Sequence, residues 1–135
     1  MAKRRCGICR KEGHDSRNCP QLPFGILSSG TEVQHAGKRK GWNCSCKDKK
    51  GKSGWIVHWR IYSGSLRETC AKEGCGNTAT DGAHITIVEG SRIQKLIPTC
   101  GGCNSDWSQK LYGKFTVNKV VWVNANPNVL KCRRL

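Results

Sequence analysis

Cysteine content is the feature that most constrains how this chain can fold. Ten of the 135 residues are cysteines, and eight of them lie in close pairs. The charged start MAKRRC is followed by no long apolar segment, so we expect no secretory signal and no export. Cysteines in a protein that is not exported are more often metal ligands than disulfide partners. We therefore expect bound metal ions to hold the fold together.

The first predicted metal site lies in the segment CGICRKEGHDSRNC, residues 6–19. Its four ligands follow the spacing Cys6-x2-Cys9-x4-His14-x4-Cys19. Zinc prefers four tetrahedral nitrogen and sulfur ligands, and a segment this short cannot bury a hydrophobic core of its own. The spacing therefore predicts a structural zinc site in a separate module over residues 1–20.

A second set of four cysteines comes later in the chain, as Cys70-x4-Cys75 and Cys100-x2-Cys103. Residues 76–99 separate the two pairs, and this length suits a β-hairpin. Four sulfur ligands in two pairs are typical of a structural zinc site. The sequence therefore predicts two zinc ions, one for each set.

Three cysteines remain outside these sets, namely Cys44, Cys46 and Cys132. Together with His35 or His58 they could form a third zinc site, although a Cys-x-Cys pair is geometrically tight. Buried or free thiols are the alternative. His58 has two further interpretations, as a buried structural histidine or as a second catalytic histidine.

The spacing of apolar residues predicts a few short elements. In SGWIVHWRIYSG, apolar side chains at positions 55, 56, 59 and 62 repeat as on one helical face, with Ser53 as N-cap and Gly64 at the end. A strand is the alternative for this segment. Two strands are predicted over 83–88 and 92–99, a helix over 104–112, and a last strand over 114–123.

These elements predict a small α+β domain, stabilised by zinc, over residues 53–135. Residues 21–52 are interpreted as a basic linker to the module at residues 1–20. Apolar runs such as VVWV are too short to cross a membrane, so we expect no membrane partner. The expected location is intracellular, in the nucleus, the cytoplasm or a virion.

The chain is strongly basic, with a formal net charge of +15. Residues 1–60 carry 14 basic and 4 acidic side chains, whereas residues 61–135 carry 10 and 5. This excess favours a polyanionic partner, RNA or DNA, over a role in solubility alone. The residues predicted to contact it are Arg4, Arg5, Arg10, Lys11, Arg17, Lys38, Arg39, Lys40, Trp42, Lys47, Lys49, Lys50 and Lys52.

Residues 6–19 resemble the CCHC zinc knuckle family, including the stretch KEGH and the ending NCP. Knuckles bind single-stranded nucleic acid or proteins, and the resemblance implies the same here. Many of them carry an aromatic residue after the first cysteine, on which a base stacks, but Gly7 stands at that position. Because stacking contributes about 1–3 kcal/mol per base, we expect this knuckle to contact phosphates instead. A zinc-stapled tether is the alternative.

Residues 68–113 resemble the treble-clef zinc fold and, within it, a degenerate HNH endonuclease motif. The match rests on the order of the cysteine pairs and on the stretches GAHI and LIPTCGGCN. The resemblance implies a β-hairpin and a helix around a zinc ion with four cysteine ligands. It also implies that His84 is a general base, which activates water beside Mg²⁺ or Mn²⁺.

Two positions depart from the HNH pattern. Ala83 stands where the family has an acidic residue or a histidine that binds the catalytic cation, and Lys95 stands near the place of an asparagine. The residues left to hold such a cation are Asp81, Asn104 and Asp106. A structural role beside the zinc site or in the core is the alternative for His84, and we expect no nuclease activity.

The sequence leaves three functions open. The first is a zinc-dependent nucleic-acid-binding or nucleoprotein scaffold protein, which binds mainly through phosphate contacts. The second is an HNH-type, metal-dependent endonuclease with His84 as its general base. The third is a structural component of a viral or other nucleoprotein assembly.

Overall fold

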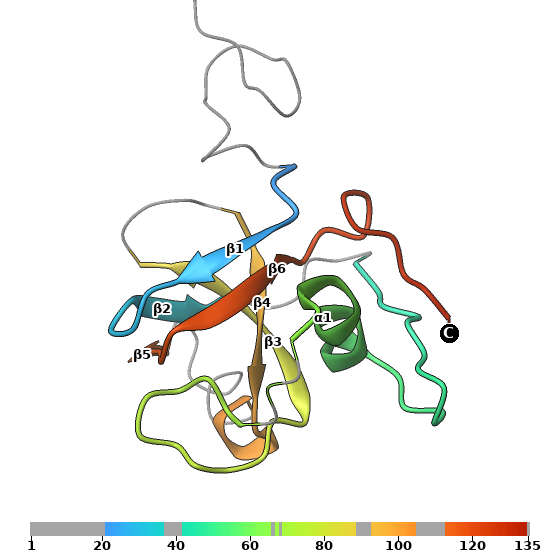
Figure 1. The fold of residues 1–135 in the computed structure, drawn as a ribbon. Helices are drawn as coiled ribbons and strands as arrows, with labels where there is room; N and C mark the ends of the chain where they lie inside the picture. The colour runs from blue at the N-terminus through green and yellow to red at the C-terminus, as the bar shows by residue number, and fades with distance from the viewer. Residues whose placement is uncertain are drawn as a thin grey trace, which may run out of the picture.

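The structure is a computed structural model, which describes residues 21–36, 42–65, 67, 69–88, 93–104 and 113–134. The predicted zinc knuckle, with its four ligands and its basic residues, lies outside the described residues. So do Lys38, Arg39, Lys40 and Asp106. The described residues form a small α+β fold, in which a helix packs against a curved antiparallel sheet (Figure 1).

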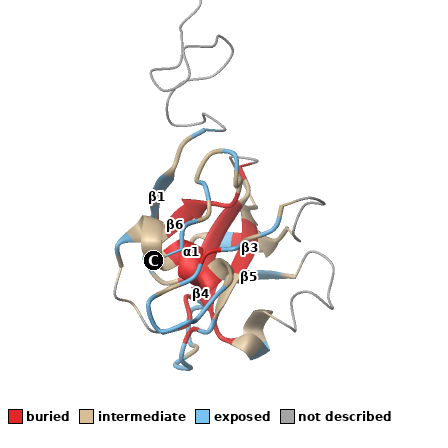
Figure 2. Ribbon diagram, turned by 90° about the vertical axis from the view of Figure 1, so that its right-hand side faces the viewer, coloured by how far each residue is buried: buried red, intermediate tan, exposed pale blue. Residues whose placement is uncertain are grey.

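Six strands make up the sheet. They are β1 (Phe24–Leu27), β2 (Glu32–His35), β3 (Asp81–Ile87), β4 (Lys95–Thr99), β5 (Lys114–Thr116) and β6 (Val120–Asn124). Their order is β1-β6-β4-β3-β2-β5, and every neighbouring pair is antiparallel. Buried residues are concentrated in β4, in β6 and in the helix, whereas β1 and β5 carry exposed residues (Figure 2).

The sheet is strongly curved, as the connection between β1 and β2 shows. These strands follow one another in the chain but lie four positions apart in the strand order. In a flat sheet, four steps of about 4.8 Å would separate them by roughly 19 Å. Their connection contains a tight turn, in which Thr31 N–H donates to the Ser28 carbonyl (3.1 Å). Such a turn spans less than about 7 Å. Val117 bonds to both Gly30 (2.8 Å) and Thr31 (3.1 Å), and this closes one end of the sheet.

The helix α1 (Trp55–Ser63) lies across β3, β4 and β6. Its buried side chains include Ile56, Val57 and Trp59, and the Trp59 indole N–H donates to the Val121 carbonyl of β6 (2.8 Å). The start of α1 lies very close to β3, because a Cβ atom at Gly82 would be 2.6 Å from the carbonyl carbon of Trp55. Glycine at this position therefore allows the helix to pack directly on the strand backbone.

The predicted helix and hairpin are confirmed. The helix ends at Gly64, which has a left-handed φ of 64° that glycine adopts without strain. Its N-cap is Gly54 and not Ser53, and Gly54 provides no side chain to cap the helix. The predicted strands at 83–88 and 92–99 correspond to β3 and β4, which pair from Asp81↔Thr99 to Ile85↔Lys95.

Three other predictions need correction. The segment 21–52, interpreted as a linker, contributes β1 and β2 to the sheet, paired with β6 and with β3 and β5. The single strand predicted over 114–123 is two strands, since the chain at 117–119 bonds to residues outside the sheet ladder. The helix predicted from 104 is already helical at 101–104, and the rest of it lies outside the described residues. No helix among the described residues is long and apolar enough to span a membrane.

Candidate metal centres

One group of potential metal ligands joins three remote segments, and we call it the Cys44 cluster (Cys44, Cys46, His58 and Cys132). Cys44 and Cys46 precede α1, His58 lies on α1, and Cys132 follows β6. The four ligand atoms all lie within 4.8 Å of one another. The Sγ atoms of Cys44 and Cys132 are 3.4 Å apart. Nδ1 of His58 lies 3.2 to 3.9 Å from the three sulfur atoms.

Burial and hydrogen bonds together set the protonation of the Cys44 cluster. Burial raises the pKa of Cys44 and of Cys46, and it lowers the pKa of His58 to about 4, so that the imidazole is neutral near pH 7. For Cys132, burial raises the pKa, but the Ser45 N–H and the neighbouring thiols lower it by more. A neutral imidazole is the form that binds a metal. A divalent cation would also stabilise the thiolates that burial disfavours.

Backbone N–H groups point at the sulfur atoms of the Cys44 cluster. Ser45 N–H donates to Cys132 Sγ (3.2 Å), Cys46 N–H to Cys44 Sγ (3.4 Å), and Arg133 N–H to Cys46 Sγ (3.2 Å). Hydrogen bonds of this kind orient metal ligands and stabilise thiolates. Main-chain N–H groups of the segment before α1 and of the segment after β6 thus hold the sulfur atoms in place.

The second group is the Cys70 cluster (Cys70, Cys75, Cys100 and Cys103), which is the four-cysteine set that the spacing predicts. Its ligand atoms also lie within 4.8 Å of one another. Cys75 Sγ is 3.9 Å from Cys100 Sγ and 3.8 Å from Cys103 Sγ. The first pair comes from the loop before β3, and the second from the end of β4 and the helical turn at 101–104.

Protonation in the Cys70 cluster is uneven. Burial raises the pKa of Cys70 and of Cys103. It also acts to raise the pKa of Cys100, but the Cys103 N–H and thiol and the side chains of Cys75 and Asn77 lower that pKa to about 7. Cys100 is therefore ready to ionise near neutral pH, as a metal ligand must.

Both clusters fit a tetrahedral zinc ion. Sulfur atoms about 2.3 Å from zinc lie about 3.8 Å from one another in a tetrahedron. The distances of 3.8 and 3.9 Å in the Cys70 cluster match this spacing. In the Cys44 cluster the sulfur atoms of Cys44 and Cys132 are 3.4 Å apart. The distances of 3.2 to 3.9 Å from His58 Nδ1 to the sulfur atoms bracket the value of about 3.5–3.6 Å expected between nitrogen and sulfur ligands of one zinc ion. A disulfide would need sulfur atoms about 2.0 Å apart, and the seven described cysteines are all free thiols.

The structure resolves which histidine accompanies Cys44, Cys46 and Cys132. It is His58, which is fully buried against them. His35 lies instead on β2, opposite Ile85 of β3. The sequence contained one relevant signal, because His58 follows the CSC motif at the distance of one loop and one helical turn. The spacing alone does not show which face of α1 is turned towards the cysteines, and so it does not select His58.

His84, the predicted general base, is buried on β3. It is 6 % exposed, its Nδ1 lies 3.1 Å from Gln94 Oε1, and its ring meets the Trp55 ring edge-on at 4.7 Å. Asp81 lies three residues earlier, so the alternation of side chains puts it on the opposite face of the strand. There its carboxylate accepts a hydrogen bond from Asn104 (3.0 Å). The candidate cation ligands Asp81 and Asn104 thus contact each other, and they do not share a face of β3 with His84.

The described residues of the predicted nucleic-acid contact differ in exposure. Lys47, Lys49, Lys50 and Lys52 are exposed. Trp42 is half-buried and packs against the hydrophobic core. Its ring is therefore partly committed to the fold, whereas the lysines are open to a partner.

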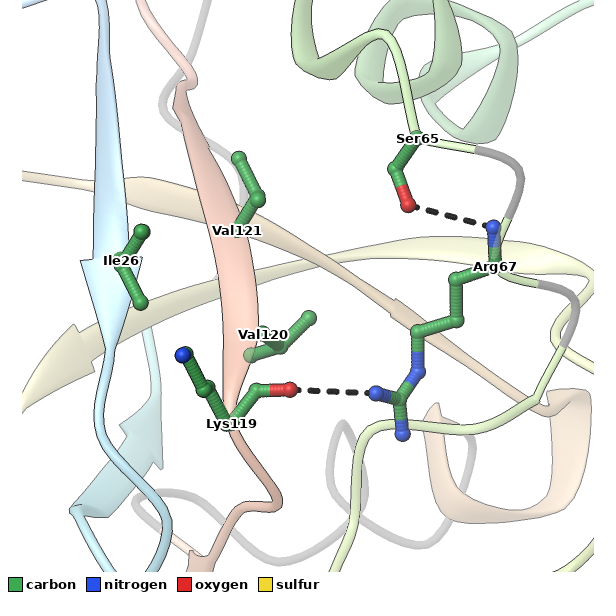
Figure 3. A pocket seen from close by; sticks show the side chains of 6 residues that line it. All are labelled: Ile26, Ser65, Arg67, Lys119, Val120 and Val121. Atoms are coloured by element: carbon green, nitrogen blue, oxygen red, sulfur yellow. Dashed lines mark hydrogen bonds between the residues drawn. The ribbon is translucent and has the colours of Figure 1, made fainter.

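A pocket of about 250 Å³ lies beside β1, lined by residues such as Ile26, Arg67 and Val121 (Figure 3). Two cationic residues, Arg67 and Lys119, line it. The Arg67 guanidinium is already engaged, because it donates to the carbonyls of Thr69, Lys119 and Cys70 (2.9, 3.2 and 3.3 Å). Arg67 thereby fixes the main chain at the first ligand of the Cys70 cluster. We assign this residue a structural role.

Comparison with models of known families, with curated proteins and with solved structures finds no match to this chain. Its function must therefore be inferred from the two clusters and from the distribution of charge.

Proposed function

We propose that this protein is a zinc-dependent nucleic-acid-binding or nucleoprotein scaffold protein, in which the zinc ions maintain the fold. The observation that carries the proposal is the number of ligands in each cluster. Each supplies four protein ligands, so a tetrahedral zinc ion would have no open position for water or substrate. Sites of this kind are structural, whereas catalytic zinc sites keep one position open.

The charge of the chain supports nucleic acid as the partner. Zinc binding by both clusters as thiolates changes the net charge of +15 by −3, since seven thiolates form and two Zn²⁺ ions are added. A further zinc ion on the three cysteines of the knuckle changes it by −1, which leaves about +11. Such a surface attracts phosphates and releases their counterions on binding. We therefore propose that phosphate contacts dominate the affinity.

We further propose that two parts of the chain adopt the folds that they resemble, the zinc knuckle and the treble clef. Residues 6–19 would form a zinc knuckle with a third zinc ion. The Cys70 cluster, the β3–β4 hairpin and the helical turn at 101–104 follow one another in the order of a treble clef. A nuclease is not proposed, because His84 and Asp81 lie on opposite faces of β3 and His84 is buried.

Two measurements test this function. Native mass spectrometry should count three zinc ions per chain, one more than the two predicted from the sequence, because the Cys44 cluster adds a site. Fluorescence anisotropy with a short labelled single-stranded RNA, and with DNA of the same sequence, should show affinity that falls steeply with salt. A zinc-loaded, folded protein that binds neither strand at low salt would overturn the proposed function.

A further inference from the structure

The Cys44 cluster gathers basic residues from two segments that are remote in the chain, 47–52 and 131–134. The turn after Cys46 carries Lys47, Lys49, Lys50 and Lys52, all of them exposed. The segment around Cys132 carries Lys131, Arg133 and Arg134, also exposed. We call these seven side chains the basic ridge. The sequence predicts nucleic-acid contacts for the four lysines of the turn, but not for the three residues near Cys132.

Main-chain bonds align the two halves of the basic ridge. Lys47 N–H donates to the Arg133 carbonyl (2.9 Å), and Lys47 forms β-bridges with both Ser53 and Arg134. The Tyr62 hydroxyl of α1 donates to the Lys131 carbonyl. In Figure 1 the C-terminal segment and the chain before α1 accordingly run on the same side of α1. The basic side chains are thus presented on a fixed scaffold.

Hydrogen bonds close the turn at 47–52, and they engage its acidic residue. Asp48 is the sole acidic residue between Trp42 and Ser53. Its Oδ1 accepts hydrogen bonds from the N–H groups of Lys50 (2.9 Å) and Lys52 (2.8 Å), and its own N–H donates to the Lys52 carbonyl (2.9 Å). Asp48 therefore closes the turn, while the lysine side chains remain exposed to solvent.

We propose that the basic ridge binds the phosphate backbone of nucleic acid, and that the Cys44 cluster assembles it by fixing residues 131–134 beside residues 47–52. This rests on the proposed function and locates its contact surface. Like charges held side by side repel, and a polyanion relieves that repulsion while its condensed counterions are released. Without the cluster, the two halves would keep the main-chain bonds of Lys47 and the Tyr62 bond to Lys131, but would lose the ligands that join Cys44 and Cys46 to Cys132.

Nucleic acid fits the basic ridge better than a membrane or an acidic protein. Stable binding of a helix to a membrane surface buries apolar side chains in the lipid, and the buried centre of a protein interface is enriched in apolar and aromatic residues. The exposed large apolar residues of the described chain are Phe24 and Ile26, and both lie on β1. The basic ridge therefore presents positive charges and no large exposed apolar side chain.

The test compares two triple variants of the full chain that remove the same charge. The ridge variant carries Lys131→Gln, Arg133→Gln and Arg134→Gln. The control variant carries Lys72→Gln, Lys114→Gln and Lys119→Gln, three exposed lysines outside the ridge. Affinity for a labelled single-stranded RNA, and for DNA of the same sequence, is measured by anisotropy over a series of salt concentrations.

We expect the ridge variant to lower the slope of log affinity against log salt by about 2–3, since each lost phosphate contact removes about 0.7–0.9. The control variant should change the slope by less than about 1. Equal slopes for the ridge variant and the parent protein would overturn the ridge but leave the proposed function standing. A second result would overturn the ridge as a nucleic-acid site and assign it to a membrane surface. In that result the ridge variant binds nucleic acid as the parent protein does but loses affinity for phosphatidylserine vesicles.

A third variant tests the role of the cluster. Cys132→Ser removes a ligand but none of the seven charges, and we expect one fewer zinc ion together with the same slope as the ridge variant. An unchanged slope with that ion lost would show that the cluster does not assemble the ridge. If Cys132→Ser does not fold, the two triple variants, which touch no ligand, decide the proposal.

Discussion

Lys95 is a buried cation, and its charge should reduce the stability of the protein near neutral pH. Lys95 is 2 % exposed. Two contacts partly compensate its buried charge, because Nζ donates to the Ile93 carbonyl (3.3 Å) and lies 4.6 Å from the centre of the Trp122 ring. Burial lowers its pKa from 10.5 to about 8. We predict that Lys95→Met, which keeps most of the length of the side chain and removes the charge, raises the free energy of unfolding near pH 7.

The magnitude follows from the shift in pKa. One unit corresponds to about 1.4 kcal/mol, so a fall from 10.5 to about 8 destabilises the charged native state by about 3 kcal/mol. Loss of the cation–π contact with Trp122 offsets about 0.5–2 kcal/mol of this. The expected net gain of Lys95→Met near pH 7 is therefore about 1–3 kcal/mol.

The sign of the pH dependence is also fixed. Between the folded pKa of about 8 and the unfolded value of 10.5, the unfolded chain binds a proton at Lys95 that the folded protein has released. Stability of the parent protein therefore rises with pH in this window, by about 1.4 kcal/mol per unit, relative to the variant. By about pH 10 the penalty should have fallen below about 1 kcal/mol.

Urea unfolding followed by tryptophan fluorescence, at several pH values from about 7 to 10 and with saturating zinc, measures this gap. The difference between the two proteins cancels the contributions of cysteine ionisation and metal binding. Lys114→Met, at an exposed position on β5, is the matched control and should show no gap that varies with pH. A gap that stays constant over the whole range, or a Lys95→Met protein that is less stable near pH 7, would refute the reasoning.

Three further predictions concern the sheet and the metal centres. Gly82→Val should lower the free energy of unfolding by about 1–3 kcal/mol, because the added carbon meets the backbone of α1 at 2.6 Å, whereas Gly76→Val, with nothing within 4 Å, should stay within about 0.5 kcal/mol in the same urea titration. His84→Ala should cost about 1–3 kcal/mol through a lost buried hydrogen bond and leave nucleic-acid binding unchanged; plasmid cleavage in Mg²⁺ that disappears in the folded variant would contradict this. Cys103→Ser should remove one zinc ion from the native mass spectrum, and an unchanged count would show that the Cys70 cluster holds none.

The local spacing of residues determined a good part of the structure. Cys100 and Cys103 lie three residues apart, and the hairpin that carries them to Cys70 and Cys75 is itself encoded by two apolar stretches. All the information for that cluster is contained in one short, continuous stretch of the chain, so the sequence predicts it directly. The same holds for α1, whose apolar spacing and final glycine are local features.

The short strands β1 and β2 were not apparent from the sequence. Each has four residues, and each pairs with strands distant in the chain, as in Phe24↔Val123. A four-residue strand acquires its stability from those partners and not from its own propensity. The charge of residues 38–52 therefore outweighed the weak strand signal in 21–36, and the whole segment resembled a linker.

Only the tertiary structure decided how the leftover cysteines are used. Cys44 and Cys132 are 88 residues apart, and no local pattern relates them. They meet because α1 packs across β6, so that the chain leaving β6 runs back along the helix to the cysteines that precede it. The sequence by itself supplied the ligands and the basic residues. Their union in one cluster, and with it the alignment of residues 131–134 beside residues 47–52, depends on the packing of helix and sheet, because contacts so far apart in the chain form only when the intervening fold brings them together.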